Sequence, residues 1–182
     1  TKGFRDIIEL RRGMRVGISP YNLKVKFPEQ LVPRSRRLGI DERIGPTGEV
    51  ITPLHEGEVE AAVKRLVNDD CAAIAICFLY AYVAPQHERR AAEIARAIAP
   101  GAFITTSHET IPISREFERF NTTVVGAYVG SIFASYIDRL EDELRRSGFK
   151  GHLLLIQSNG GIQDKDTAKS NPVTTLLSGP SA

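Results

Sequence analysis

A short polar turn directly follows a strongly apolar run near the end of the chain. The residues Ser158-Asn159-Gly160-Gly161 come after HLLLIQ (152–157), a run that is typical of a buried strand. Ligands of open α/β sheets bind beyond the carboxyl ends of the strands, and two glycines let backbone N–H groups approach an anion. Asn-Gly is equally favoured in ordinary tight turns, because both residues tolerate positive φ. From the residues alone, the turn is therefore either an anion-binding loop or a plain reversal of the chain.

A second turn of the same kind stands at the end of the sequence. Ser178-Gly179-Pro180 follows VTTLL (173–177), which we interpret as another strand. The two strand-then-glycine units could line one crevice, because each places a polar glycine turn at the end of a strand. The candidate residues for lining a substrate or phosphate site are therefore Ser158, Asn159, Gly160, Gly161, Ser178 and Gly179.

The other residue types that perform chemistry are scattered. The four histidines are far apart and show no metal-binding spacing: His55, His87, His108 and His152. We interpret His87 as structural at a helix start, and His108 as structural although it could reach a crevice after a strand. Cys71 and Cys77 show no metal or redox spacing, and no Gly-x-Ser-x-Gly, Walker or Gly-x-Gly-x-x-Gly motif occurs. The sequence therefore predicts no metal site and leaves the catalytic residues unknown.

The elements that must position these residues begin with short pieces. Thr1-Lys2-Gly3 is typical of a strand end that runs into a short helix. The prolines of FPEQLVPRSRRLGIDER (27–43) exclude a long helix, so we expect an extended segment. RIGPTGEVI (43–51) predicts a β-hairpin with its turn around Pro46-Thr47-Gly48.

An alternation of helices and strands follows. Apolar residues recur at helical spacing from Val59 to Val67, and CAAIAICFLYAYV (71–83) predicts a central strand covered on both faces. HERRAAEIARAIA (87–99) predicts a second helix, and AFITTS (102–107) a second strand. This order indicates α/β architecture with parallel pairing.

The longest helical pattern covers residues 115–148. Its apolar residues step mostly by four, from Phe117 to Leu144. Gly126 and Gly130 lie within it, where they either interrupt the helix or let another backbone approach closely.

Bulk composition narrows the function classes. Hydrophobic residues make up 42% of the 182 residues and charged residues 25%, which is ordinary for a globular protein. The net charge of +2 gives no electrostatic reason to expect nucleic acid. No apolar run approaches the length of a membrane span, and two unpaired cysteines fit a reducing compartment. We therefore expect a cytoplasmic protein without nucleic-acid or membrane partners.

Six motifs occur in a fixed order along the whole chain. They are TKGFRDIIELRRG, the LVPR…DER…PL pattern from Leu31 to Leu54, AICFLYAY with PQHERRAAEI, SREFERFNTTVVGAYV, LLLIQSNGG and TLLSGPSA. Together they resemble the hydantoinase A/5-oxoprolinase family, which includes N-methylhydantoinase and the ATP-dependent acetone and acetophenone carboxylase subunits.

The resemblance implies a fold and a place for this segment within it. It implies an α/β fragment of the two-domain fold shared by sugar kinases, heat-shock ATPases and actin, with mostly parallel strands and a long connecting helix. Residues 1–120 would be the remainder of the first domain, and 121–182 the connecting helix and the start of the second. The family's glycine-rich phosphate loops are absent from this sequence, so we expect an internal fragment that binds no nucleotide by itself.

The resemblance also implies a reaction and its partners. The parent enzyme would use ATP and Mg²⁺ to activate a cyclic amide for hydrolysis. The alternatives are a ketone carboxylase subunit and a non-catalytic binding or assembly module. A second, large hydantoinase B-type subunit is the expected partner. In the SREFERFNTT match, Glu116, Arg119, Asn121 and Thr122 are candidates for a second wall of the site at the domain junction.

Overall fold

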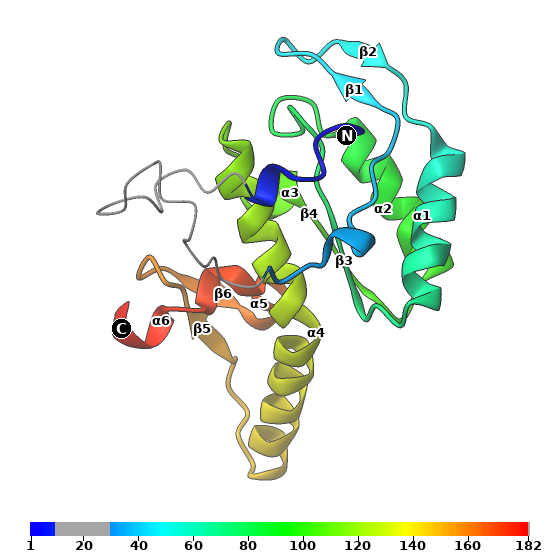
Figure 1. Ribbon diagram of the computed structural model, residues 1–182. Coiled ribbons are helices and arrows are strands. Elements are labelled where there is room, and N and C mark those ends of the chain that lie inside the picture. Colours follow the sequence, from blue (N-terminus) through cyan, green and yellow to red (C-terminus); the bar gives the residue numbers. More distant parts are fainter. Residues whose placement is uncertain (10–29, 182) are drawn as a thin grey trace, which may run out of the picture.

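Two parallel strands form the centre of the N-terminal part in the computed structural model, which describes residues 1–9 and 30–181 (Figure 1). β3 (Ala73–Ile76) and β4 (Phe103–Thr106) pair from Ala73 opposite Phe103 to Ile76 opposite Thr106. α2 (Gln86–Ile98) connects them, as parallel pairing requires a crossover of this kind. The predicted helix–strand–helix–strand order and its parallel pairing are confirmed.

Helices cover this strand pair from two sides. α1 (Glu56–Asn68) packs on α2, α2 packs on the strands, and α4 (Glu116–Arg146) packs against both strands from the opposite side (Figure 1). The core between α1, α2 and β3 is built from small and branched apolar residues such as Val63, Ile74, Ala91 and Ala95, all buried. This burial of one apolar stripe per helix is the main source of stability in such a layered arrangement.

Two further strand pairs are antiparallel hairpins. β1 (Arg43–Ile44) pairs with β2 (Val50–Thr52), and β5 (Leu154–Ile156) pairs with β6 (Ile162–Asp164). The hairpin predicted around Pro46 is confirmed, with Gly48 at φ +92° in its turn. Among the described residues one strand pair is parallel and two are antiparallel, so the expectation of mostly parallel strands does not hold there. The reason is the short connections, because a tight turn can join only antiparallel strands.

The remaining elements are short. They are η1 (Ile7–Glu9), η2 (Arg34–Arg36), α3 (Ser107–Thr110), α5 (Lys165–Ser170), η3 (Pro172–Thr175) and α6 (Ser178–Ser181). Asp164 caps α5, because its side chain accepts hydrogen bonds from the backbone N–H groups of Asp166 and Thr167, each at 2.9 Å. The hydrogen bond from the Thr167 N–H is the main cause that lowers the pKa of the Asp164 carboxyl.

The strand expected at 173–177 is wrong. Pro172 begins η3, and the Thr174 hydroxyl donates to the Asn171 carbonyl at 2.8 Å. The Thr175 hydroxyl likewise donates to the Pro172 carbonyl at 2.8 Å, so both threonines satisfy local carbonyls in place of a strand ladder. The expected Ser178-Gly179-Pro180 turn is the beginning of the short helix α6.

The other strands are shorter than the apolar runs in the sequence suggested. β3 ends at Ile76, because the Phe78 and Leu79 N–H groups donate to side chains and not to a neighbouring strand. β5 is confirmed as a strand but not as a buried one, since Leu154 is 58% exposed. At the start, a 3₁₀ turn replaces the expected strand end and helix, and residues 30–42 hold η2 within an otherwise irregular segment. The residues after Glu9 in that expected helix, and residues 27–29, lie outside the described residues.

α4 is the longest element and runs without interruption for 31 residues. At about 1.5 Å per residue it is about 46 Å long. Its amino-terminal half packs on β3 and β4, and its later turns pack on α5 (Figure 1). Gly126 and Gly130 do not break the helix, and the group that approaches Gly130 is the Phe103 ring and not another backbone. No helix in residues 1–9 and 30–181 combines the length and apolarity that crossing a membrane requires.

Alanine at the two glycines of α4 should have opposite effects on stability. A Cβ at Gly130 would lie 2.3 Å from the Phe103 ring, so Gly130→Ala should lower the free energy of unfolding by about 1–3 kcal/mol through overpacking. A Cβ at Gly126 meets its nearest atom at 3.9 Å. Gly126→Ala should therefore raise the free energy of unfolding by about 0.5–1 kcal/mol through helix propensity. Urea denaturation of both variants measures this, and equal effects would contradict the packing at Gly130.

Candidate functional site

The Ser158–Gly161 turn joins β5 to β6 and is closed by its own hydrogen bonds. The Gly160 N–H donates to the Gln157 carbonyl at 3.0 Å, and the Gly161 N–H donates to Asn159 Oδ1 at 2.9 Å. Gly160 lies at φ +82°, where a residue without a side chain is favoured. Both glycine N–H groups are thus engaged inside the turn. The role of these residues in lining a ligand site stays a prediction.

The two glycine-bearing segments do lie side by side. The Ser158 N–H donates to the Thr174 carbonyl at 2.6 Å, and Ser158 Oγ accepts from the Leu177 N–H at 3.0 Å. Ser178 and Gly179 follow directly, and Gly179 is exposed with open space where a side chain would stand. The contact arises through η3 and not through the strand expected at 173–177.

The four candidates at the start of α4 have different surroundings, and their role in lining a site stays a prediction. Asn121 donates from Nδ2 to the Phe117 carbonyl within the helix at 2.8 Å, and Thr122 is half-buried. Glu116 is half-buried, with its Oε1 4.0 Å from a terminal nitrogen of Arg119. Arg119 differs from the other three, because it is completely buried and reaches from α4 to the ends of both parallel strands.

Arg119 ties three segments together at the carboxyl end of the sheet. Its Nε donates to Ser107 Oγ at 3.1 Å, and its two terminal nitrogens donate to the carbonyls of Ile113 at 2.7 Å and Phe78 at 2.9 Å. The guanidinium also lies over the Tyr82 ring, 5.1 Å from its centroid. A buried cation is tolerable only with such a full set of partners.

Glu88, which joins this network through Ser107, is also completely buried. Oε1 accepts from the Phe78 N–H at 2.7 Å and from Ser107 Oγ at 2.6 Å. Oε2 accepts from the His108 N–H at 2.9 Å and contacts His108 Nδ1 at 2.8 Å. The Ser107 hydroxyl therefore bridges Glu88 and Arg119, so that one buried anion and one buried cation offset each other.

His108 extends this network toward solvent. Its Nε2 is buried and has no hydrogen-bond partner among the described residues. The nearest carboxylate oxygen in an ion-pair contact is Glu109 Oε1 at 4.0 Å, and the Glu109 side chain is 57% exposed. A histidine held by a buried carboxylate beside an exposed one is an arrangement suited to proton transfer.

A second histidine–carboxylate pair lies nearby in the same part of the fold. His87 Nδ1 is 2.9 Å from Glu42 Oε2, and both residues are buried. Glu42 also accepts from the Thr1 hydroxyl, whose oxygen accepts from the Leu79 N–H. This pair fixes the loop after β3, which supports the structural interpretation of His87.

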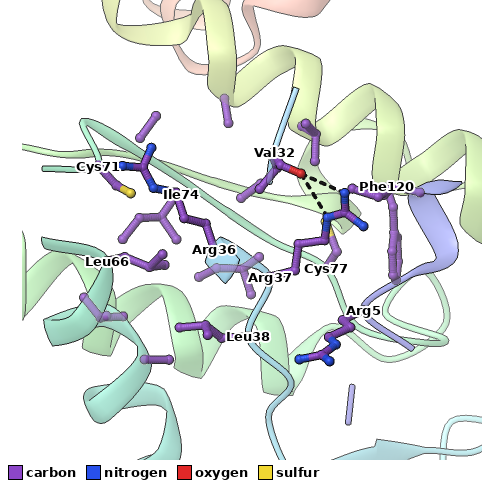
Figure 2. Close-up of a pocket in the computed structure, with 18 of the residues that line it drawn as sticks. Arg5, Val32, Arg36, Arg37, Leu38, Leu66, Cys71, Ile74, Cys77 and Phe120 are labelled. Atoms are coloured by element: carbon purple, nitrogen blue, oxygen red, sulfur yellow. Dashed lines mark hydrogen bonds between the residues drawn. The ribbon is translucent and has the colours of Figure 1, made fainter. Parts of the chain in front are cut away.

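An apolar pocket of about 440 Å³ lies along β3 and between α1 and α4 (Figure 2). Consecutive residues from Asp70 to Phe78 contribute to its wall. Three arginines also line it, and two of them donate to carbonyls: Arg37 to Val32 at 3.0 and 2.8 Å, and Arg36 to Asp69 at 2.9 Å. Burial raises the pKa of the Cys77 thiol in this wall, so this thiol is not a ready nucleophile. The pocket offers apolar volume, while the groups suited to chemistry gather at the end of the strands.

Comparison with known proteins identifies the family. Residues 1–99 match the sequence model for the hydantoinase/oxoprolinase N-terminal region, and residues 119–182 match the model for hydantoinase/oxoprolinase. The chain belongs to the hydantoinase/oxoprolinase family, as its motifs indicated.

Three curated relatives align with the whole chain. An uncharacterized protein of Methanocaldococcus jannaschii is 36% identical, the caprolactamase subunit alpha of Pseudomonas jessenii 32%, and the acetophenone carboxylase gamma subunit of Aromatoleum aromaticum 31%. The chain spans 26% of the length of each of these relatives.

A solved structure agrees with this assignment. The crystal structure of the ATP-dependent caprolactamase from Pseudomonas jessenii superposes with a TM-score of 0.83 at 31% identity. The alignment covers 96% of this chain and 26% of that one. The α/β fold is therefore shared with an enzyme of this family.

Sequence reasoning missed most of the polar network. From the sequence, Glu88 is only one residue of the predicted helix 87–99, and Ser107 is the last residue of the predicted strand 102–107. The available signal was the placement of Ser107-His108-Glu109 directly after an apolar strand, where parallel sheets carry their ligands. Arg119 was selected, but through the family resemblance.

Removal of the Arg119 guanidinium should destabilise the protein strongly. Arg119→Met leaves Glu88 as an uncompensated buried charge, so the free energy of unfolding should fall by about 3–5 kcal/mol. Arg146→Met, at an arginine side chain that is 72% exposed, is the control and should stay within about 0.5 kcal/mol of the wild type. Similar denaturation midpoints for the two variants would show that the hydrogen bonds of Arg119 do not contribute this much to stability.

Proposed function

We propose that the full-length protein is a subunit of an ATP-dependent hydrolase that opens cyclic amides. The observation that carries this proposal is the 32% identity to a caprolactamase subunit along the entire chain. The structural likeness to an ATP-dependent caprolactamase supports it, at a TM-score of 0.83. The hydantoinase/oxoprolinase family match is consistent with a ring amide as the reacting group.

The chemistry explains why such an enzyme would need ATP. Amide resonance gives the C–N bond partial double-bond character, with a rotational barrier of about 18–20 kcal/mol, and lowers the electrophilicity of the carbonyl carbon. ATP supplies a phosphoryl group that can block this resonance at the amide oxygen. Water can then add to the carbon, and the ring nitrogen leaves as an amine. A second water hydrolyses the acyl phosphate that remains and releases a carboxylate and inorganic phosphate. The protein's task is to position the amide and water and to move protons.

The proposal extends to the organisation of the full-length protein. It includes an actin-like two-domain fold, with residues 1–120 in the first domain and 121–182 forming the connection and the start of the second. The continuous helix α4 supports a stiff connection of this kind. A large second subunit is the proposed partner, in keeping with relatives that are named as subunits.

The described residues give no support for a nucleotide or metal site at the Ser158–Gly161 turn. The glycine N–H groups of the Ser158–Gly161 turn are engaged within the turn, and the described ranges contain no cluster of three or more His, Cys, Asp or Glu suited to a metal ion. No phosphoryl-transfer step is therefore assigned to these residues. In our proposal, ATP and Mg²⁺ are held by other parts of the full-length protein.

A ketone carboxylase subunit is the second candidate function. The acetophenone carboxylase gamma subunit matches the whole chain at 31% identity, close to the 32% of the caprolactamase subunit. ATP would there activate an enolate for reaction with bicarbonate-derived carbon. The two functions share a scaffold and differ in the substrate that triggers ATP consumption.

Phosphate release from ATP by the full-length protein with its partner subunit distinguishes the two functions. The assay uses a panel of lactams, hydantoins, 5-oxoproline and small ketones, with and without bicarbonate. Release that depends on a cyclic amide and not on bicarbonate is the expected result. Ketone-dependent release coupled to bicarbonate incorporation would favour the carboxylase, and silence across the panel would remove support for both.

The Ser158–Gly161 turn can be tested in the same assay. If the turn lines the substrate site, Asn159→Ala should lower turnover at least about tenfold through lost positioning. Stability should fall by no more than about 0.5–1.5 kcal/mol, since one hydrogen bond of an exposed turn is lost. Asn68→Ala, at another exposed asparagine, is the matched control. Unchanged turnover in Asn159→Ala would identify the turn as a plain reversal of the chain.

A further inference from the structure

The two ring nitrogens of His108 have very different surroundings. Nδ1 lies 2.8 Å from Glu88 Oε2, while Nε2 is buried without a partner among the residues described here. The His108 side chain is only 8% exposed. An unpartnered buried ring nitrogen costs free energy, so its persistence at the end of a parallel strand points to a function.

The hydrogen-bond network fixes the tautomer of this histidine. Glu88 accepts three other hydrogen bonds, from the Phe78 N–H, the Ser107 hydroxyl and the His108 N–H. An ionised carboxylate can only accept, so Nδ1 carries the ring proton. Arg119 offsets the charge of Glu88 through Ser107. Nε2 then holds a free lone pair, which is the state of a general base.

Glu109 stands beside this lone pair and connects it to solvent. Glu109 Oε2 accepts from the Thr106 hydroxyl at 2.7 Å, which orients the carboxylate. Its Oε1 lies 4.0 Å from His108 Nε2, and its side chain is 57% exposed. Both residues belong to α3, directly after β4. Because Nε2 is buried, access to it requires a neighbouring side chain to move, and Glu109 is the exposed side chain in contact with it.

We propose that His108 and Glu109 form the proton-transfer pair of the amide-opening reaction, an inference that rests on the proposed function. Nε2 takes a proton from the water whose oxygen bonds to the amide carbon. The imidazole then gives this proton to the substrate nitrogen. The second proton of the water follows by the same route as the C=O bond forms and the C–N bond breaks, so the nitrogen leaves as an amine. Glu109 accepts a hydrogen bond from the same water and holds it in place.

The charged surroundings suit this cycle. Glu88 from α2 faces Nδ1 and stabilises the imidazolium while the proton is held. Glu109 from α3 faces Nε2, and Arg119 from α4 offsets Glu88 through Ser107. Glu116 lies beside Arg119 on α4. The His108 ring thus lies between the Glu88 and Glu109 carboxylates, and the Arg119 guanidinium lies on the far side of Ser107.

The experiment uses the full-length protein with its partner subunit and two variants. Glu109→Gln changes an exposed side chain and leaves the fold intact. His108→Asn keeps a side-chain N–H that can donate to Glu88 and removes Nε2. Both should lower substrate-dependent turnover by about 10²–10⁴-fold, the usual contribution of a general acid–base group. Glu60→Gln, at an exposed carboxylate on α1, is the control and should keep full turnover.

The pH profile separates a proton-transfer role from a structural one. A general base must be deprotonated, so wild-type turnover should fall on the acid side, and His108→Asn should lose this fall. A purely structural His108 would lower the melting temperature and leave the profile of the surviving activity unchanged. Glu109→Gln with turnover within threefold of wild type would overturn the proposal, even if His108→Asn failed to fold.

Failure of the proposed function gives a different pattern. If a ketone is turned over in place of a cyclic amide, the hydrolase function is wrong, and the same variants decide whether the pair transfers protons in that reaction. If nothing is turned over, carbethoxylation by diethyl pyrocarbonate decides. Modification of Nε2 of His108, mapped by mass spectrometry, is expected. A His108 that stays unmodified while exposed histidines react would overturn the proposal, since a nitrogen closed to a small reagent is closed to a substrate.

Discussion

The hydrogen bonds to the buried Glu88 carboxylate are the interactions on which the rest of the structure depends. This carboxylate sits at the start of α2 and receives hydrogen bonds from the segments after β3 and after β4, so it fixes the ends of both parallel strands to one helix. Arg119 brings α4 to the same point through Ser107 and the Phe78 carbonyl. Burial makes this arrangement stringent, because a buried charge without partners costs several kcal/mol, and each hydrogen bond to a charged group contributes about 1.5–3 kcal/mol.

The pocket and the buried polar network lie in different parts of the molecule. The pocket along β3 is lined mostly by apolar residues, and among its three arginines Arg37 is engaged by the Val32 carbonyl and by Asp6 and Glu9. The polar groups with chemical capacity lie instead at the carboxyl end of β4, where the chain turns directly into α3. A site at this position takes its precision from the sheet, since the strands and α4 hold its residues more rigidly than a loop would. In the function proposed for the full-length protein, these elements would form one rigid wall of the site.

The sequence predicted the elements that depend on strong periodicity and missed those that depend on distant partners. α1, α2, β4 and α4 follow from regular apolar spacing, and the first hairpin follows from its turn residues. The strand at 173–177 was wrong, because threonine-rich stretches favour a strand by propensity, and only the structure shows their hydroxyls bonding to carbonyls three residues back. The polar network could not be predicted for the same reason. Glu88 and Ser107 are nineteen positions apart, and nothing in either neighbourhood indicates that they meet.

The continuity of α4 has a mechanical consequence. A helix of 31 residues without a proline or a kinked glycine behaves as a beam, and it is anchored at one end by Arg119 and contacted farther along by α5. Bending this helix would break successive main-chain hydrogen bonds. A displacement of the β5–β6 hairpin, which reaches α4 through α5, would therefore tilt or rotate α4 as a whole. The far end of this lever is the guanidinium that faces Ser107. Movement in the carboxyl-terminal part of the chain would therefore change the position of Arg119 relative to Ser107, which lies between the buried charges of Arg119 and Glu88.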